Sequence, residues 1–158
     1  MARSNRKLTQ FTVSRLQQIL KFGLGRFSHS DTAGNTRVET VVEEGRGISY
    51  AAVRLYDQEI FRMHYLPSNK KEVRGISVYS GGFYDQNGRP SRTTRERLNG
   101  ILDAMGTANL IPEGVRVYLD DNGGCQLGTG DVKKPLDSAN ESIQIFPHSE
   151  RLVFLTDL

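Results

Sequence analysis

Four arginines and three hydroxyl side chains lie close together near the middle of the chain, and they are the residues best suited to bind a ligand. They are Arg89, Arg92, Arg95 and Arg97, with Ser91, Thr93 and Thr94 between them. Guanidinium groups and the unpaired N–H groups of a helix start both donate hydrogen bonds to oxygen anions, so this stretch would suit a phosphate. The alternative is that the arginines pair with acidic residues elsewhere or remain solvated, because single exposed ion pairs contribute little stability.

These side chains belong to residues 76–106, whose pattern predicts a strand, a glycine-rich turn and a helix. Thr93, followed three residues later by Glu96, is a capping box, so we expect the helix to begin at Thr93 or Thr94. Four apolar side chains then follow at helical spacing, and Gly106 is expected to close the helix in a left-handed conformation. The apolar side chains are Leu98, Ile101, Leu102 and Met105.

The first 27 residues form a basic segment. They contain six Lys or Arg residues and no Asp or Glu, whereas the whole chain carries only +3, so residues 28–158 carry −3. Apolar residues at helical spacing predict an amphipathic helix that ends at Gly23. This segment fits a helix docked on the domain, an arm on nucleic acid, a helix on a membrane surface or an organelle transit peptide. The basic side chains expected to attract phosphates non-specifically are Arg3, Arg6, Lys7 and Arg15.

Residues 28–158 are expected to form a single α+β domain. Its mainly antiparallel β-sheet would carry the central helix, with the N-terminal helix in addition. Residues 28–37 are rich in Ser, Thr, Gly and Asn and predict a loop. Strands are predicted at 37–44, in a hairpin at 48–66 and at 74–80. Residues 114–128 predict a second hairpin with a type I′ turn at Asn122 and Gly123, and two last strands lie near the C-terminus.

The chain carries no recognisable catalytic or metal-binding motif. The histidines, His29, His64 and His148, are far apart, and a lone Cys125 excludes an internal disulfide and a cysteine-based zinc site. Acidic residues at 85–88 and 120–122 lack the spacing of a calcium loop, and turn formation explains them better. We therefore expect no enzyme, no cofactor and no metal. No apolar run approaches the ~18 residues of a membrane span, so we expect no integral membrane association. The lone cysteine favours a reducing, cytoplasmic location.

A short motif resembles a known family. Its residues are Ser80, Gly81, Gly82 and the aromatic Phe83, then Thr93, Thr94, Arg97, Leu98 and Asn99. The arrangement is similar to the motif SGG, aromatic, then TTxxR(I/L)N of small phage- and plasmid-encoded domains that have no assigned function. The resemblance covers roughly residues 48–128 and implies a viral protein in a host cytoplasm. The chain departs from that pattern by inserting YDQNGRPSR, and the motif residues also fit a purely architectural role in turns and caps.

Three functions are compatible with these features. The first is a small accessory protein that binds nucleic acid, DNA included, or another phosphate-bearing ligand at the arginine-rich helix start. The aromatic residues Tyr79, Phe83 and Tyr84 could then stack on bases, or else they fill the core. The second is a protein-binding module, such as an inhibitor of a host or defence protein or a minor virion component. The third is a sponge for a small phosphorylated signal, which needs a concave pocket and an aromatic wall. The sequence leaves the oligomeric state open.

Overall fold

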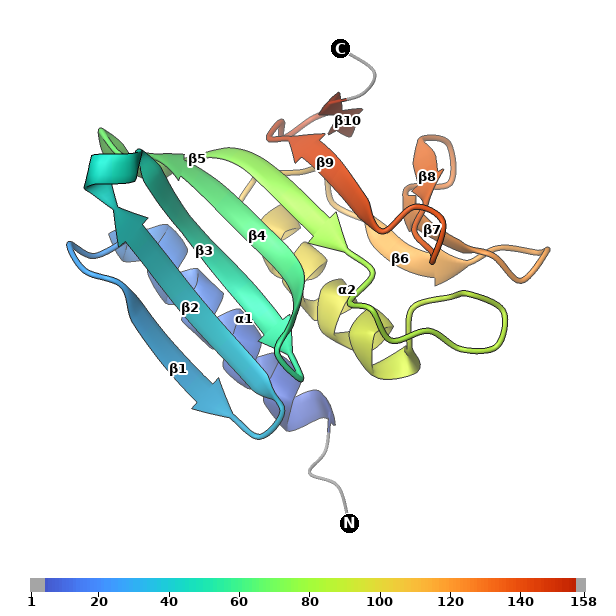
Figure 1. The fold of residues 1–158 in the computed structure, drawn as a ribbon. Coiled ribbons are helices and arrows are strands. Elements are labelled where there is room, and N and C mark those ends of the chain that lie inside the picture. The colour runs from blue at the N-terminus through green and yellow to red at the C-terminus, as the bar shows by residue number, and fades with distance from the viewer. Residues whose placement is uncertain (1–4, 156–158) are drawn as a thin grey trace.

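A large antiparallel sheet covered on one face by two helices dominates the fold (Figure 1). The structure is a computed structural model and describes residues 5–155. Within these residues the chain forms two α-helices, a seven-stranded sheet and a three-stranded sheet. The architecture is therefore α+β and mainly β, with an N-terminal and a central helix, as the sequence predicts.

The large sheet has the strand order β1-β2-β3-β4-β5-β9-β10, and its neighbouring strands are antiparallel. Its strands are β1 (His29–Ala33), β2 (Thr36–Glu43), β3 (Ile48–Leu55), β4 (Gln58–Leu66), β5 (Asn69–Tyr79), β9 (Ser142–Phe146) and β10 (Val153–Phe154), with a short 3-10 helix, η1 (Glu44–Arg46), between β2 and β3. The first five strands follow one another by tight turns. After an excursion through residues 80–141, which lie outside this sheet, the chain returns to it as β9 and β10. These C-terminal strands extend the sheet next to β5.

The excursion builds a separate small sheet beside the central helix. Its strands are β6 (Arg116–Leu119), β7 (Cys125–Gly128) and β8 (Lys133–Pro135), in that order. The predicted second hairpin is β6–β7, but its turn is not type I′, since Asn122 is not among the residues with positive φ. Asp120 N–H instead donates to Gly124 O at 2.8 Å, and the Asp120 carboxylate accepts the N–H groups of Asn122 and Gly124. A longer turn organised by Asp120 therefore joins the two strands.

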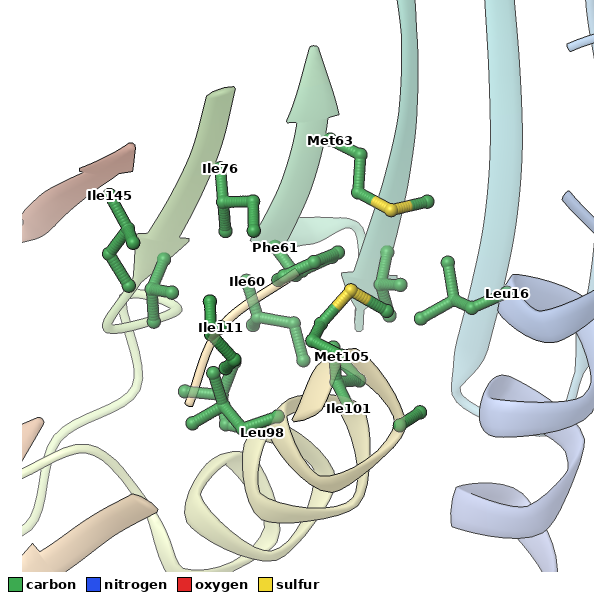
Figure 2. Packing of buried hydrophobic residues seen from close by; sticks show 14 of the residues in the cluster. Leu16, Ile60, Phe61, Met63, Ile76, Leu98, Ile101, Met105, Ile111 and Ile145 are labelled. Carbon is green, nitrogen blue, oxygen red and sulfur yellow. The ribbon is translucent and has the colours of Figure 1, made fainter. Parts of the chain in front are cut away.

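Both helices contribute to one continuous core with the sheets (Figure 2). Helix α1 (Asn5–Phe22) supplies Leu16, and α2 (Arg92–Thr107) supplies Leu98, Ile101 and Met105, all fully buried. They meet apolar side chains of β4, β5 and β9, and the period-2 pattern of β3 places its alternate small and branched residues in the same core. The N-terminal helix is thus docked on the domain through an apolar face. The hydrophobic effect favours this docking because it removes that face from water.

The segment expected to be a loop at 28–37 is in fact a strand and a turn. β1 pairs with β2 from His29↔Thr40 to Ala33↔Thr36. Its polar composition is tolerated because β1 is the edge strand and most of its side chains are exposed. The prediction of a loop was therefore wrong: exposed edge strands lack the apolar alternation on which the prediction relied.

Candidate functional site

Helix α2 begins at Arg92, one or two residues earlier than the sequence predicts. The N-cap is Ser91, whose Oγ accepts the N–H of Thr94 at 3.2 Å and also pairs with the Thr94 hydroxyl at 2.9 Å. Thr93 is therefore inside the helix, and the Thr93–Glu96 capping box does not form. Glu96 accepts instead from Arg92 Nε at 2.9 Å and from Asn5 Nδ2 at 3.0 Å. Because the Ser91 side chain already accepts an N–H group of the first turn, the helix starts there and Thr93 does not act as the cap.

The C-terminus of α2 also differs from its prediction. The helix continues to Thr107, and Asn109, at φ 60°, takes the left-handed position that we expected of Gly106. Leu110 N–H donates to Met105 O, and Asn109 N–H donates to Gly106 O, both at 3.0 Å. This is a Schellman motif with asparagine in place of glycine, which the short polar side chain of asparagine permits.

Two of the four arginines are engaged in the loop that precedes α2. Arg89 Nε donates to Asp85 Oδ2 at 2.7 Å, and its Nη1 donates to Gly123 O at 3.3 Å. Partial burial acts to raise the pKa of Asp85, but hydrogen bonds from Arg89 and Asn87 outweigh it and hold that pKa below its usual value. Arg95 Nε donates to Pro90 O at 3.1 Å. Both guanidinium groups thus stabilise the inserted loop. The Asp85 carboxylate also accepts backbone N–H groups of this turn, as expected of a turn residue.

Arg97 is a structural residue inside the molecule. It is 0% exposed, and its Nη1 donates to Asn5 O at 3.0 Å and to Thr9 Oγ1 at 2.9 Å. Among residues 5–155, its Nε and Nη2 have no hydrogen-bond partner, and burial lowers the pKa of the guanidinium. Arg97 therefore holds α1 against α2. Of the four arginines only Arg92 presents a largely exposed side chain, at 83%, and it pairs with Glu96.

The basic residues of the N-terminal helix are spread along α1, whose first turn contacts the start of α2 through Asn5. Arg3 lies outside the described residues, whereas Arg6 and Lys7 are exposed on α1. Arg15 Nε lies 3.0 Å from Asp31 Oδ2, next to the edge strand β1. Arg97 is therefore in the core, Arg92 is exposed and Arg15 lies beside β1, so the described residues named from the sequence do not all face one surface.

The motif residues of the resemblance have architectural partners. Gly81 and Gly82 have φ of 84° and 75°, which glycine adopts freely, and a Cβ at Gly81 would meet Ile60 Cγ2 at 3.0 Å. The Asn99 amide donates to Val117 O at 3.0 Å and accepts Val117 N–H at 2.7 Å. The Asn99 side chain thus bonds both backbone groups of Val117, as a neighbouring strand would, and joins α2 to the small sheet.

The face of the large sheet that points away from the helices carries charges in pairs. Arg54 Nε lies 2.7 Å from Glu39, Arg62 Nη2 lies 2.7 Å from Glu59, and the Arg62 guanidinium also lies 3.6 Å from the centre of the Tyr50 ring. Opposite charges are balanced there. The two guanidinium groups are therefore already paired with carboxylates, which leaves them less available to a phosphate backbone.

A groove that the sequence did not predict lies between α1 and the edge of the sheet. We call it the α1–β1 groove; it has a volume of about 300 Å³, and residues that line it include Ile19, Phe22, Phe27, His29, Asp31 and Val38. Phe22 and Phe27 are 67% and 79% exposed, the highest values among the large apolar residues described. Two large apolar side chains exposed beside one groove make it a candidate surface for interaction.

The surroundings of the α1–β1 groove are basic. Arg15 and Lys21 come from α1, Arg26 from the following loop, and Lys21 Nζ lies 5.3 Å from the centre of the Phe22 ring. Among the described residues, the carboxylate that lines the groove is that of Asp31, which already faces Arg15 at 3.0 Å and His29 at 3.4 Å. The groove therefore combines an apolar interior with a positive rim.

The remaining candidates for chemistry are separate from one another. Cys125 is buried, and burial raises the pKa of its thiol to about 11, which leaves it unreactive. Among residues 5–155, no three histidine, cysteine or acidic side chains gather in a way that would hold a metal ion. Within the same range, neither helix has the length and apolar character needed to cross a membrane.

The resemblance to phage- and plasmid-encoded domains stays a prediction. Comparisons of the chain with models of protein families, with curated proteins and with solved structures found no match.

Proposed function

We propose that this protein is a protein-binding module that takes an extended, acidic and partly apolar segment of a partner protein in the α1–β1 groove. The observation that carries the proposal is the pair of exposed phenylalanines, Phe22 and Phe27, beside an apolar groove at the open edge of the large sheet. This is the second of the three functions that the sequence allows, moved to a surface that the sequence did not indicate.

The edge strand gives the groove a way to bind main chain as well as side chains. β1 is the terminal strand of the sheet, and no strand within residues 5–155 pairs with its outer edge. An extended segment that adds to such an edge gains main-chain hydrogen bonds, while alternate side chains enter neighbouring pockets. Aromatic anchors supply most of the binding energy in such interfaces. Phe22 and Phe27 would act as these anchors.

Charge complementarity defines the partner. Because residues 1–27 contain no acidic side chain, a segment with Asp or Glu beside its apolar residues is attracted to the rim, and like-charged segments are repelled. A lipid surface would use the basic residues and the aromatic rings, but it would use neither the concave shape nor the strand edge. The nucleic-acid hypothesis retains the basic α1 and the exposed Arg92, while the other arginines of the helix start are engaged elsewhere.

Selection from a random peptide library displayed on an unrelated carrier, followed by fluorescence anisotropy of the enriched peptide, tests the proposal. We expect acidic peptides with aromatic or branched residues, and a loss of about tenfold or more in affinity for Phe22→Ser combined with Phe27→Ser. The matched control is Phe83→Ser, which removes another exposed ring, 41% exposed, far from α1 in sequence. Its affinity should stay within about twofold of the original protein.

The same titration with single- and double-stranded oligonucleotides and with anionic vesicles separates the alternatives. Enrichment of basic peptides, or of peptides insensitive to the two serine substitutions, would overturn the proposal. Salt-dependent oligonucleotide binding that falls in Arg92→Ala combined with Arg95→Ala, without peptide binding, would instead support the anion site at the start of α2.

A further inference from the structure

A second groove lies on the other side of the C-terminal turn of α1, along β5. We call it the β5 groove. It has a volume of about 510 Å³, and residues that line it include Leu20, Lys71, Arg74, Leu110, Phe146 and His148. Such a volume is in the range of small-molecule sites. None of these residues contributes to the α1–β1 groove.

The groove exists because two neighbouring strands differ in length. β5 spans Asn69–Tyr79, but β9 pairs with it only from Ile76 to Tyr79. The chain then leaves the sheet after Phe146, and residues 146–149 run toward the end of α2, where His148 N–H donates to Leu110 O at 2.9 Å. The first half of β5 thus faces an open channel that this connection closes on the far side.

The pairing of β5 is irregular along the groove. His64 pairs with Gly75 and Tyr65 pairs with Val73, so Arg74 is an extra residue between two paired ones. A second register shift follows between Tyr65 and Leu66. Bulges of this kind redirect side chains and are frequent beside binding sites. Here the irregular stretch includes both cations that border the groove, Lys71 and Arg74.

Three nitrogen donors border the groove without strong internal partners. Arg74 has only a long contact of 3.8 Å with Glu72, and the Lys71 ammonium makes no hydrogen bond or ion pair within residues 5–155. His148 Nδ1 accepts the N–H groups of Glu150 and Arg151 at 3.1 and 3.2 Å. Since Nδ1 is an acceptor, the proton of the ring lies on Nε2, which is then a donor.

Several elements also contribute apolar side chains to the groove. Leu20 comes from α1, Leu110 from the end of α2 and Val73 from β5, and the Phe146 ring is 44% exposed at the edge. Two carbonyl groups of the last turn of α2, those of Met105 and Gly106, accept hydrogen bonds in the Schellman motif, and the Leu110 carbonyl accepts the N–H of His148. Glu72 also lines the groove, 3.8 Å from Arg74, so the groove combines two cations and one carboxylate with the exposed Phe146 ring.

We infer that the β5 groove binds a small organic phosphate that carries a planar ring, with the phosphate on Lys71, Arg74 and His148 Nε2 and the ring against Phe146. Charged donors bind phosphate oxygens strongly, and an apolar wall favours a ring over an inorganic anion. The site differs from the arginine-rich helix start in its residues, since none of the four arginines there lines the β5 groove.

Isothermal titration calorimetry tests the inference with four probes: AMP, phenyl phosphate, adenosine and inorganic phosphate. We expect at least one of the two ring-bearing phosphates to bind about tenfold more tightly than adenosine and inorganic phosphate. Lys71→Met combined with Arg74→Met removes the charges and keeps the aliphatic stems, and should weaken that binding about tenfold or more. Phe146→Ser should reduce the preference for the ring-bearing probe over inorganic phosphate.

The control for charge is Lys7→Met on the exposed surface of α1, which should bind as the original protein does. Three results would each overturn the inference: no binding of either ring-bearing phosphate at millimolar concentration, equal binding of inorganic phosphate, or unchanged affinity in the double methionine variant. Thermal unfolding of each variant shows whether it is folded. Because the peptide titration uses other residues, failure here leaves the proposed function standing, and the reverse also holds.

Discussion

Replacing Gly100 by alanine should destabilise this protein, although the same change stabilises most helices. Alanine is favoured over glycine inside a helix by about 1 kcal/mol. Gly100 lies in α2 where the helix packs on α1, and a Cβ there would approach Thr9 Cγ2 to 2.2 Å. Real side chains do not tolerate this separation, so Thr9 must move.

The size of the effect follows from what Thr9 does. Its Oγ1 accepts a hydrogen bond from Arg97 Nη1 at 2.9 Å, and turning the threonine methyl away from the added Cβ moves this hydroxyl. A hydrogen bond to a charged group contributes about 1.5–3 kcal/mol, and Arg97 Nη1 would keep only its bond to Asn5 O. After subtraction of the helix preference, Gly100→Ala should lower the free energy of unfolding by about 0.5–2 kcal/mol. For a chain of this size that corresponds to a fall in Tm of roughly 1–8 °C.

Urea and thermal unfolding, followed by far-UV circular dichroism, measure this in Gly100→Ala, in Thr9→Ser and in the double variant. Serine keeps the hydroxyl but has no Cγ2, so Gly100→Ala in the Thr9→Ser background should be neutral or stabilising by up to about 1 kcal/mol. The reversal of sign is the signature of the close approach. Equal stabilisation by Gly100→Ala in both backgrounds would refute the reasoning.

Three further outcomes are expected from single sites. Asn99→Ala leaves the buried N–H and C=O of Val117 without partners, and should lower the free energy of unfolding by about 1.5–5 kcal/mol in urea titrations; a change below about 0.5 kcal/mol would contradict this. Because Cys125 is 1% exposed, and burial also raises the pKa of its thiol to about 11, the thiol should react with a maleimide or disulfide reagent at pH 8 only when the protein opens, and labelling as fast as a free thiol would show that it is accessible. Arg97→Met should increase amide hydrogen exchange in residues 5–12 more than in the rest of α1, since both hydrogen bonds of Arg97 Nη1 go to that half; uniform exchange along α1 would contradict the assignment.

The parts of the fold that sequence reasoning predicted are those that depend on local pattern. Alternation in β3 identified the buried side of the strand, helical spacing identified the core face of α2, and Gly23, at φ 80°, ends α1 as expected. In each case the residue type and its near neighbours determine the conformation. Strand β1 was not predicted because most of its side chains are exposed and show no apolar alternation. It is defined by its pairing with β2.

The arrangement of the candidate residues depends on distant parts of the chain, which is why it could not be predicted. Arg97 donates to Asn5 and Thr9, and Arg89 donates to the Gly123 carbonyl. The positions of both side chains therefore depend on elements far away in the sequence. The helix start illustrates a local ambiguity as well. Ser91 and Thr93 are both good caps, and the contact of Asn5 with Glu96 accompanies the choice of Ser91. This contact forms when α1 docks on α2, so the local sequence alone did not identify Ser91 as the cap.

The last turn of α1 is a wall of both grooves. Ile19 lines the α1–β1 groove and Leu20 lines the β5 groove, because consecutive residues of a helix point about 100° apart. This turn is held in place by Gly23 N–H donating to Ile19 O at 2.7 Å and by Leu24 N–H donating to Lys70 O at 2.8 Å, which ties it to β5 itself. A ligand that displaces the turn from one side therefore changes the shape of the other groove. By linkage, any such effect on affinity is the same in both directions, so peptide and organic phosphate should be titrated in each other's presence.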